Sequence, residues 1–290
     1  MKLATRDVIY EFPERPLIMG IVNLVADSFS GDGLTDIDAA LDRTRQHLAD
    51  GADIIDIGAE SARTNREAIS EKAEAAQLLR FLERWPELRA TRPAGTSWPQ
   101  LSINTWRPAV ARAALEAGGD ILNDIGGLPT DENARICAET GATLLIMHTV
   151  GEPKVPHTHV GYDNIMVEID EFFAEKIALA ESAGVPRDAI ILDPGIDFAK
   201  QRDDNLHIFR ELERLHRFER PILLPISRKT VIGDVLGLPN PADRDAGTVA
   251  CIVQGLLRGA HIFRVHNVRA AVQTVRTIEA VEAIAAPPVQ

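Results

Sequence analysis

The chain has 290 residues, of which 45% are hydrophobic and 26% charged, so it has the composition of a globular protein and not of a disordered or fibrous chain. Its formal net charge of −12 argues against a general nucleic-acid binder or a basic membrane-surface protein, and an anionic ligand would need a local cluster of cations. Cys137 and Cys251 lie far apart and exclude a disulfide framework. Residues 1–20 have no apolar signal core, and no stretch approaches about 18 apolar residues. We therefore expect a soluble, cytoplasmic protein that binds neither nucleic acid nor membranes.

Short apolar runs rich in Ile, Val and Leu recur along the whole chain. Such runs are typical of strands that are buried on both faces of a parallel sheet. We expect eight of them, at residues 17–22, 53–57, 101–103, 121–122, 143–147, 189–192, 222–226 and 262–265. A stretch of helical length follows each run, at residues 37–49, 68–84, 109–117, 133–140, 165–183, 205–217, 243–258 and 268–284.

Eight alternations of strand and helix predict an α/β fold, a (β/α)8 TIM barrel in a single domain. A Rossmann fold is the competing interpretation, but no predicted strand is followed by G-x-G-x-x-G. The helix-to-strand junctions favour the barrel because Gly51, Gly118, Gly141 and Gly259 lie just past helix ends, where a left-handed cap favours glycine.

Three ranges divide the chain. Residues 1–16 are expected to form a short N-terminal β-hairpin over the bottom of the barrel, residues 17–285 the barrel itself, and residues 286–290 a frayed tail. The segment 90–100, rich in Pro, Gly and Ser, leads from a helix into a strand and therefore lies on the amino-terminal rim, away from the expected site.

Polar side chains follow the carboxyl ends of all eight predicted strands, where barrels of this kind build their sites. In strand order they are Asn23 with Asp27, Glu60 with Arg63, Asn104, Asn123, His148, Asp193, Ser227 with Lys229, and Arg264 with His266. One such residue is often only a helix cap, but eight together predict a ligand site.

These side chains divide by chemistry into two sets. Asn104, Asn123, Asp193 and Lys229 supply the amides and charges that read the donor and acceptor edge of a flat heterocycle. The second set is Arg63, Arg264 and His266, with Asn23 nearby. Two guanidinium groups and an imidazole suit phosphate oxygens, which arginine binds through two parallel hydrogen bonds.

In order and spacing these segments resemble dihydropteroate synthase, of the pterin-binding barrel family, from about Pro16 to Val281. The matching segments are Ile18–Asn23 with Asp27–Ser30, Gly51–Gly58 with Glu60–Arg63, Ser102–Thr105, Leu122–Asp124, Met147–His148, Leu192–Ile196, Ser227–Lys229, Arg244–Thr248 and Arg264–His266. The resemblance implies a transferase of folate biosynthesis. It would join 6-hydroxymethyl-7,8-dihydropterin diphosphate to p-aminobenzoate, giving 7,8-dihydropteroate and pyrophosphate.

The resemblance also assigns roles to individual residues. Asn123, Asp193 and Lys229 would hold the pterin, with Asn104 in the same pocket where the family has Asp. A separate set would hold the diphosphate and its Mg²⁺ ion: Arg63, Arg264 and His266 for the oxygens and Asn23 for the metal. Ser227 and Phe29 would border p-aminobenzoate. Asp27, Arg63 and Lys229 are the expected catalytic residues, and the family implies a homodimer.

The chain departs from the family pattern at several positions. Asn104 replaces a carboxylate, Ala62 and Thr64 replace Thr and Pro, and Asp197 and Ala199 replace two glycines. These changes keep two alternatives open. One is a catalytically impaired pterin-binding paralogue with a binding or regulatory role. The other is a methyltetrahydrofolate-binding methyltransferase barrel, although that family does not need the Arg and His residues of a diphosphate site.

Overall fold

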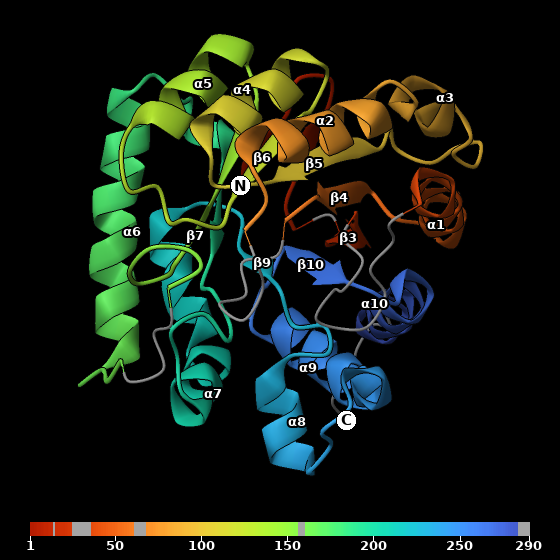
Figure 1. Cartoon of the computed structure of the whole chain (residues 1–290). Helices are drawn as coiled ribbons and strands as arrows, with labels where there is room; N and C mark the ends of the chain where they lie inside the picture. Colours follow the sequence, from red (N-terminus) through yellow and green to blue (C-terminus); the bar gives the residue numbers. More distant parts are fainter. Residues whose placement is uncertain (14, 25–35, 61–67, 156–159, 284–290) are drawn as a thin grey trace.

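The computed structural model describes residues 1–13, 15–24, 36–60, 68–155 and 160–283. Eight parallel strands form one sheet in the order β8-β7-β6-β5-β4-β3-β10-β9. They are β3 (Leu17–Asn23), β4 (Ile54–Gly58), β5 (Gln100–Asn104), β6 (Ile121–Asp124), β7 (Thr143–Met147), β8 (Ile190–Asp193), β9 (Leu223–Leu224) and β10 (Ile262–Val265). A parallel bridge between Leu192 and Ile222 brings the two ends of the sheet together into a nearly closed barrel (Figure 1). The predicted TIM barrel is confirmed.

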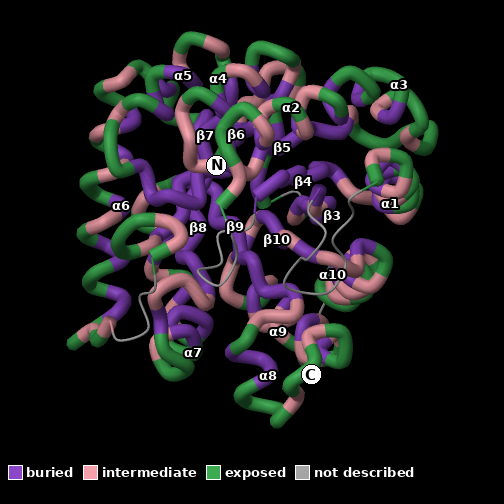
Figure 2. Tube along the Cα trace, in the orientation of Figure 1, coloured by how far each residue is buried: buried purple, intermediate pink, exposed green. Residues whose placement is uncertain are grey.

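Helices surround this barrel (Figure 1). They are α1 (Ile37–Asp50), α2 (Glu71–Leu82), α3 (Trp85–Ala90), α4 (Pro108–Glu116), α5 (Glu132–Thr140), α6 (Ile165–Ser182), α7 (Arg202–Arg210), α8 (Thr230–Leu236), α9 (Asp245–Leu257) and α10 (Val268–Glu282). Figure 2 shows buried residues along the strands and on the inner faces of the helices, and exposed residues on their outer faces. No helix in the described ranges is long and apolar enough to cross a membrane.

Two glycine caps confirm the sequence reasoning about helix ends. Gly51 ends α1 with φ 101° and Gly141 ends α5 with φ 71°, and each donates its backbone N–H to carbonyls of the last turn. These are left-handed conformations in which an L side chain would be strained. The chain therefore leaves each helix sharply and enters the next strand after one or two residues.

The helix prediction was wrong at three places. The stretch 68–84 holds α2, which ends at Leu82, but α3 directly after it was not predicted; α3 begins a new first turn at Trp85 with Pro86, a residue without a backbone N–H. The stretch 205–217 is α7 followed by a separate 3₁₀ helix from Leu212 to Phe218. Helix α8 was not predicted, since seven residues are too few to establish a helical period.

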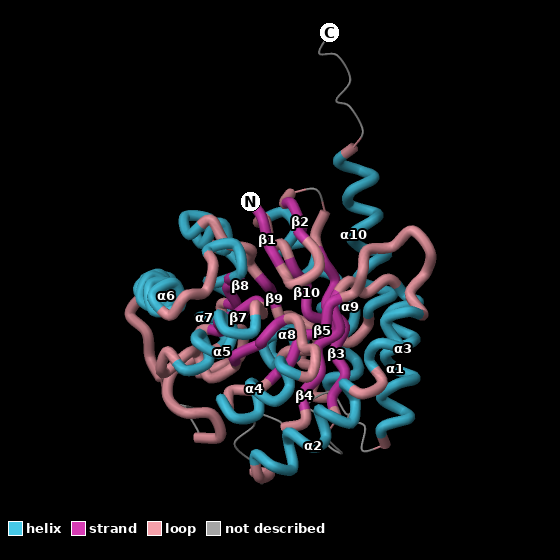
Figure 3. Tube along the Cα trace, turned by 90° about the horizontal axis from the view of Figure 1, so that it is seen from above, coloured by secondary structure: helices cyan, strands magenta, loops and turns pink. Residues whose placement is uncertain are grey.

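The amino-terminal half of the barrel interior is apolar. Inward-facing side chains from seven strands form one cluster there: Leu17, Met19, Ile54, Ile121, Leu145, Ile191, Leu223 and Ile262. Met147, the register partner of Asp193 at the end of β7, extends this cluster toward the carboxyl-terminal half. The antiparallel hairpin of β1 (Lys2–Ala4) and β2 (Ile9–Glu11) adds Leu3 and Tyr10 to this cluster and closes one end of the barrel (Figure 3). The expected hairpin is thus confirmed, whereas the predicted tail at residues 286–290 lies outside the described residues.

The carboxyl-terminal half of the interior is polar. Because side chains alternate between the two faces of a strand, the second residue after an inward apolar one also faces inward. On four strands this second residue is polar, namely Asp56, Asn123, Asp193 and Arg264. The fold therefore collects these side chains at one end of the barrel, opposite the hairpin.

Candidate active site

A buried carboxylate that the sequence analysis did not single out links the inward polar side chains. Asp56 is 1% exposed, and its Oδ1 accepts hydrogen bonds from Ser102 Oγ at 2.6 Å and Asn123 Nδ2 at 3.1 Å. Its Oδ2 accepts from Arg264 Nε at 2.8 Å and lies 2.6 Å from Arg264 Nη2. Asp56 therefore connects the set expected to hold the pterin with the set expected to hold the diphosphate. A lone acid two residues after Ile54, inside an apolar strand, was the signal that could have revealed it.

Asn123 has an acceptor atom without a partner. The residue is 2% exposed, and its Nδ2 donates to Asp56, but its Oδ1 is buried and makes no hydrogen bond to a described residue. Leaving a buried acceptor unsatisfied costs about 1–3 kcal/mol. Asn104 is the register partner of Asn123 on β5, and its side chain has no hydrogen bond to a described residue. Both amides are thus available to a ligand with N–H and carbonyl groups on one edge.

Asp193 ends β8 with one of its two carboxylate oxygens committed. Oδ1 accepts from the backbone N–H of Gly195 at 2.7 Å, and the residue is 3% exposed. Burial raises the pKa of Asp193 to about 6, against the opposing effect of the Gly195 amide and of the cations Lys229, Arg264 and Lys200. At neutral pH the side chain is therefore an ionised acceptor, with Oδ2 free of hydrogen bonds to described residues.

Lys229 follows β9 and is the N-cap residue of α8. Its Nζ donates to the carbonyl of Ile196 at 2.7 Å and lies 4.7 Å from the ring centroid of Phe198. Burial lowers the pKa of Lys229, whereas the charges of Asp197 and Asp193 raise it. Phe198 was not predicted as a site residue, although it stands five residues after Asp193 on the same loop.

A buried arginine, Arg244, stabilises the turn that carries Lys229 through hydrogen bonds to main-chain carbonyls. The guanidinium of Arg244 donates to main-chain carbonyls at 2.8 to 3.1 Å, those of Arg228, Lys229, Leu238 and Pro239. Glycine at position 233 makes room for it, because an added Cβ would lie 2.5 Å from Arg244 Cζ. The sequence placed Arg244 in a matching segment without a role, and the structure makes it a support of the Lys229 turn.

Arg264 and His266 lie on β10 and just after it. The Nε and Nη2 atoms of Arg264 are used by Asp56, and its Nη1 has no hydrogen bond to a described residue. The expected two-point contact to phosphate must therefore use the Nη1 side of the guanidinium. Ser227 Oγ lies 2.9 Å from His266 Nδ1 and accepts from its backbone N–H at 3.1 Å. Ser227 thus contacts the proposed diphosphate side of the site.

Three predicted site residues, Asp27, Phe29 and Arg63, lie outside the described residues. Asn23, the expected metal ligand, ends β3 as the register partner of Gly58 and is partly buried. Among the described ranges there is no group of three or more His, Cys, Asp or Glu side chains that could hold a metal ion.

His148, predicted as a polar group of the rim, has a structural role in this site. It is 2% exposed, and its Nδ1 lies 2.7 Å from Nζ of Lys200, which also donates to the carbonyls of His148 at 3.2 Å and Phe198 at 3.0 Å. Burial lowers the pKa of Lys200 to about 7 and that of His148 to about 2. The imidazole is therefore neutral, and the pair supports the loop that follows Asp193.

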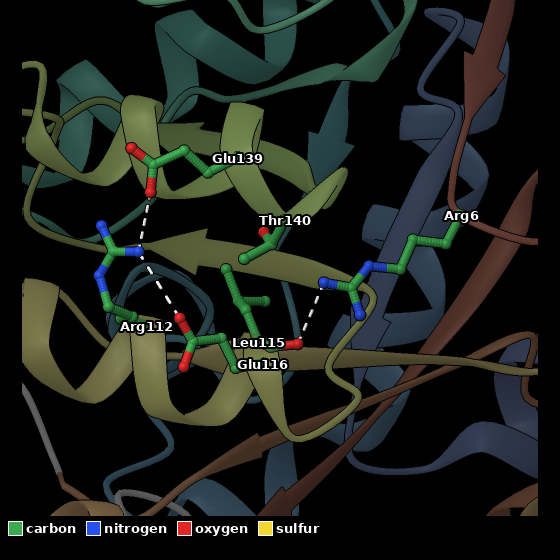
Figure 4. A pocket seen from close by; sticks show the side chains of 6 residues that line it. All are labelled: Arg6, Arg112, Leu115, Glu116, Glu139 and Thr140. Carbon is green, nitrogen blue, oxygen red and sulfur yellow. Dashed lines mark hydrogen bonds and ion pairs between the residues drawn. The ribbon is translucent and has the colours of Figure 1, made fainter.

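A surface depression of about 590 Å³ lies elsewhere, between the hairpin and the ends of α4 and α5 (Figure 4). Its arginines are already engaged within the protein. Arg112 pairs with Glu139 at 2.8 Å and with Glu116 at 3.6 Å, and Arg6 donates to the carbonyl of Leu115 at 3.0 Å. It lies near the amino-terminal end of the barrel, away from the strand ends that carry the candidate site.

Comparisons with known proteins place this constellation in a family. Residues 19–266 match the family described as pterin binding enzyme. The chain is 34% identical to the dihydropteroate synthase of Escherichia coli over 266 residues, which cover 91% of each protein. It is 37% identical to a folate synthesis bifunctional protein of Arabidopsis thaliana, and the match covers 58% of that protein. A mitochondrial folate synthesis bifunctional protein of the same plant also matches, and the chain spans about half of its length.

Solved structures give the same result. The dihydropteroate synthase of Yersinia pestis, in a complex with a sulfonamide drug, superposes with a TM-score of 0.88 at 34% identity, covering 98% of this chain and 99% of that one. The enzyme of Xanthomonas albilineans with 4-aminobenzoic acid superposes with a TM-score of 0.86 at 32% identity, with coverage of 98% and 99%. With its barrel, its polar strand ends and these matches along its length, the chain belongs to the pterin-binding enzyme family, together with the dihydropteroate synthases that it resembles.

Proposed function

We propose that this chain is a dihydropteroate synthase, a transferase that condenses 6-hydroxymethyl-7,8-dihydropterin diphosphate with p-aminobenzoate. The observation that carries the proposal is the link made by Asp56. Its carboxylate joins Asn123, whose Oδ1 has no hydrogen bond to a described residue, to Arg264, whose Nη1 has none either. A ligand with a flat heterocycle at one end and a diphosphate at the other matches that pairing.

The pterin half of the site would be read by Asn123, Asp193, Asn104 and Lys229. A pterin ring presents N–H donors beside a ring carbonyl, and Asn123 Oδ1 and Asp193 Oδ2 are acceptors without described partners. An ionised Asp193 makes a charge-assisted hydrogen bond to a ring N–H, which is about twice as strong as a neutral one. Lys229 supplies an ammonium group to the carbonyl or nitrogen acceptors of the ring.

The diphosphate half would be held by Arg264 and His266, together with Arg63, which lies outside the described residues. Ser227 orients the imidazole of His266 by a contact to Nδ1 at 2.9 Å. Positive charge at these atoms stabilises the oxygens on which negative charge grows as pyrophosphate departs. The grip on the diphosphate is therefore a contribution to the rate as well as to binding.

In the reaction, the bond between the exocyclic methylene carbon and the diphosphate oxygen breaks, and its electron pair leaves with pyrophosphate. The resulting positive charge is delocalised into the pterin ring, where the carboxylate of Asp193 stabilises it. The amine of p-aminobenzoate then forms the new C–N bond and loses a proton. We assign Asp27 to the same electrostatic role, and Phe29 and Ser227 to the border of the p-aminobenzoate position.

We also propose that Mg²⁺ accompanies the diphosphate. Its positive charge adds to that of the arginines at the phosphate oxygens. Asn23 offers one neutral oxygen, and the described residues hold no cluster of acids that would bind the ion without substrate. This donor set fits an ion that is bound mainly through phosphate oxygens and water, as is usual for Mg²⁺.

The homodimer and the cytoplasmic location are part of the same proposal. The homodimer rests on the family resemblance, and the location remains the expectation drawn from the sequence. Sedimentation equilibrium tests the first, with a dimer expected at micromolar concentration and a monomer contradicting it. Fractionation of the source cells tests the second, with the chain expected in the soluble cytoplasmic fraction.

A pyrophosphate-release assay with both substrates and Mg²⁺ tests the activity. Pyrophosphate release that requires p-aminobenzoate, together with formation of dihydropteroate, is the expected result. Asn104 without a described partner favours one alternative, a paralogue that binds pterin but turns it over poorly. Tight pterin binding by calorimetry without product formation would establish that alternative instead.

A further inference from the structure

The loop between β8 and α7 contains two residues other than glycine in the left-handed region. Asp197 has φ 66° and Ala199 has φ 50°. A residue other than glycine in such a conformation costs on the order of 1–3 kcal/mol, somewhat less for Asp than for most residues. These are the two positions at which the family pattern has glycine, so the aspartate is a feature of this chain. Its side chain makes contacts that offset the strain.

The carboxylate of Asp197 binds the first turn of α8. Its Oδ2 accepts from the backbone N–H of Thr230, and its Oδ1 accepts from that of Val231 at 3.2 Å. Asn205 of α7 fixes the aspartate from the other side. Its Oδ1 accepts from Asp197 N at 2.8 Å, and its Nδ2 donates to Asp197 Oδ1 at 3.3 Å. One side chain thus joins the loop, α7 and the start of α8.

The residue that lies between these contacts is Lys229. The two chain neighbours of Asp197 contact the ammonium group of Lys229. The carbonyl of Ile196 lies 2.7 Å from it, and the ring centroid of Phe198 lies 4.7 Å from it. The carboxylate of Asp197 itself binds the two residues that follow Lys229. Residues 196–198 therefore enclose both the side chain and the backbone of this lysine.

We propose that Asp197 is a positioning residue that fixes the Lys229 ammonium group at the substrate site. The inference rests on the proposed function for the substrate that Lys229 contacts, but the enclosure of the lysine is independent of it. Without the carboxylate, the first turn of α8 loses two hydrogen bonds to a charged acceptor. The loop is then free to move away from the turn that carries the lysine.

If Asp197 positions Lys229, its negative charge should affect the pKa of the lysine, which a purely structural support would not do. Burial lowers the pKa of Lys229, the negative charges of Asp197 and of Asp193 on β8 raise it, and Arg264 on β10 lowers it. Removing the charge of Asp197 leaves Asp193 as the remaining anion among these groups. The pKa of Lys229 should therefore fall when Asp197 becomes neutral.

Three variants separate the contributions. Asp197→Gly removes the carboxylate and, because glycine accepts a positive φ, adds no backbone strain. Asp197→Asn keeps an acceptor oxygen and tolerates the same backbone, but it has no charge. Ala199→Gly is the matched control, since it relaxes the other left-handed position of the loop and removes no polar contact.

Kinetics with the pterin diphosphate give the first readout. We expect Asp197→Gly to lower kcat/KM by at least about tenfold, which corresponds to the loss of a hydrogen bond to a charged group. Asp197→Asn should lose less at neutral pH, while the basic limb of its pH profile moves to lower pH. Ala199→Gly should match the unmodified chain. Equal kinetics for Asp197→Gly and Ala199→Gly would overturn the proposal.

Titration of Lys229 gives a second readout that needs no activity. Competitive labelling with trace acetic anhydride across pH, read by mass spectrometry, measures the pKa of Lys229, with the exposed Lys72 as an internal reference. The pKa of Lys229 should be lower in Asp197→Asn and that of Lys72 unchanged. An identical titration of Lys229 in both proteins overturns the positioning role even if the chain releases no pyrophosphate. Absence of pyrophosphate release with a shifted Lys229 instead contradicts the proposed function alone.

Discussion

Asp56 of β4 and Arg264 of β10 form a buried ion pair inside the barrel, and their strands lie on either side of β3. The Oδ2 atom of Asp56 receives Nε of Arg264 at 2.8 Å, and its side chain is fully buried whereas that of Arg264 is 19% exposed. The arginine that faces the proposed diphosphate is thus oriented by the carboxylate that also orients Asn123. Asn123 in the proposed pterin half and Arg264 in the proposed diphosphate half are therefore coupled through their hydrogen bonds to Asp56.

This coupling is measurable by a double-mutant cycle. Asp56→Asn and Arg264→Met should each lower the free energy of unfolding by about 3 kcal/mol, because each leaves a buried partner uncompensated. The double variant should lose less than the sum of the two, with an interaction energy of about 1–3 kcal/mol in urea unfolding. Additive losses would mean that the pair contributes no mutual stabilisation.

Much of this arrangement could be predicted from the sequence. The order of apolar runs predicted the barrel, and the strand ends predicted Asn123, Asp193 and Arg264 on its inner rim. Asp56 escaped prediction because it lies inside an apolar run, where only the alternation of the strand marks it as inward-facing. The contacts of Asp197 with Thr230 join residues 33 positions apart, and no local pattern encodes them.

His148 marks another limit of the sequence analysis. Its place after β7 fits a rim residue as well as a buried structural histidine, and the structure shows the second: its ring packs against Phe172 with centroids 4.8 Å apart and its Nδ1 contacts Lys200. Strand-end position alone does not distinguish a side chain that lines the site from one that supports it. That distinction depends on the direction of the side chain, which is set by packing against α6.

Stability should depend on pH through Asp193. Its pKa in the folded protein is about 6, raised from 3.8 chiefly by burial. Between about pH 4 and 6 the folded protein keeps a proton that the unfolded chain has lost, so this group lowers stability as pH rises and its full penalty applies above pH 6. Asp193→Asn should therefore raise the free energy of unfolding at pH 8 by up to about 3 kcal/mol relative to the unmodified chain. At pH 4 the two proteins should unfold at nearly the same urea concentration.

Activity should depend on the ionisation of Asp193 in the opposite direction from stability: the ionised form lowers the free energy of unfolding but raises kcat/KM. Because the ionised form of Asp193 is the proposed acceptor of the pterin, kcat/KM for the pterin diphosphate should rise with pH through about 6. Asp193→Asn should bind pterin more weakly, by roughly tenfold, and lose this acid limb. Calorimetry that finds unchanged pterin affinity in the folded variant would remove Asp193 from the pterin site.

Arg264 should distinguish the diphosphate from the bare pterin. Arg264→Gln is expected to weaken binding of the pterin diphosphate by about a hundredfold, and that of 6-hydroxymethylpterin by much less. Arg112→Gln, in the depression at the far end of the barrel, is the control and should leave both affinities unchanged (Figure 4). Equal losses for the two ligands in Arg264→Gln would mean that the arginine serves only to neutralise Asp56.

Asn104 carries the sharpest prediction, because the family has a carboxylate at this position. The amide stands on β5 as the register partner of Asn123, next to a strand whose Asp56 is already paired, and Asp193 lies on the same rim. In Asn104→Asp a further carboxylate joins two buried ones, so one of the group is pushed toward its protonated form. We therefore expect kcat at pH 7 to fall while pterin affinity stays within a few-fold, and the acid limb of the pH profile to move to higher pH. Steady-state kinetics of Asn104→Asp and of the unmodified chain distinguish an adapted site from an impaired one. A fall in kcat means that the surrounding groups have adapted to the amide, whereas a large rise means that the amide impairs an enzyme whose pocket still favours the carboxylate.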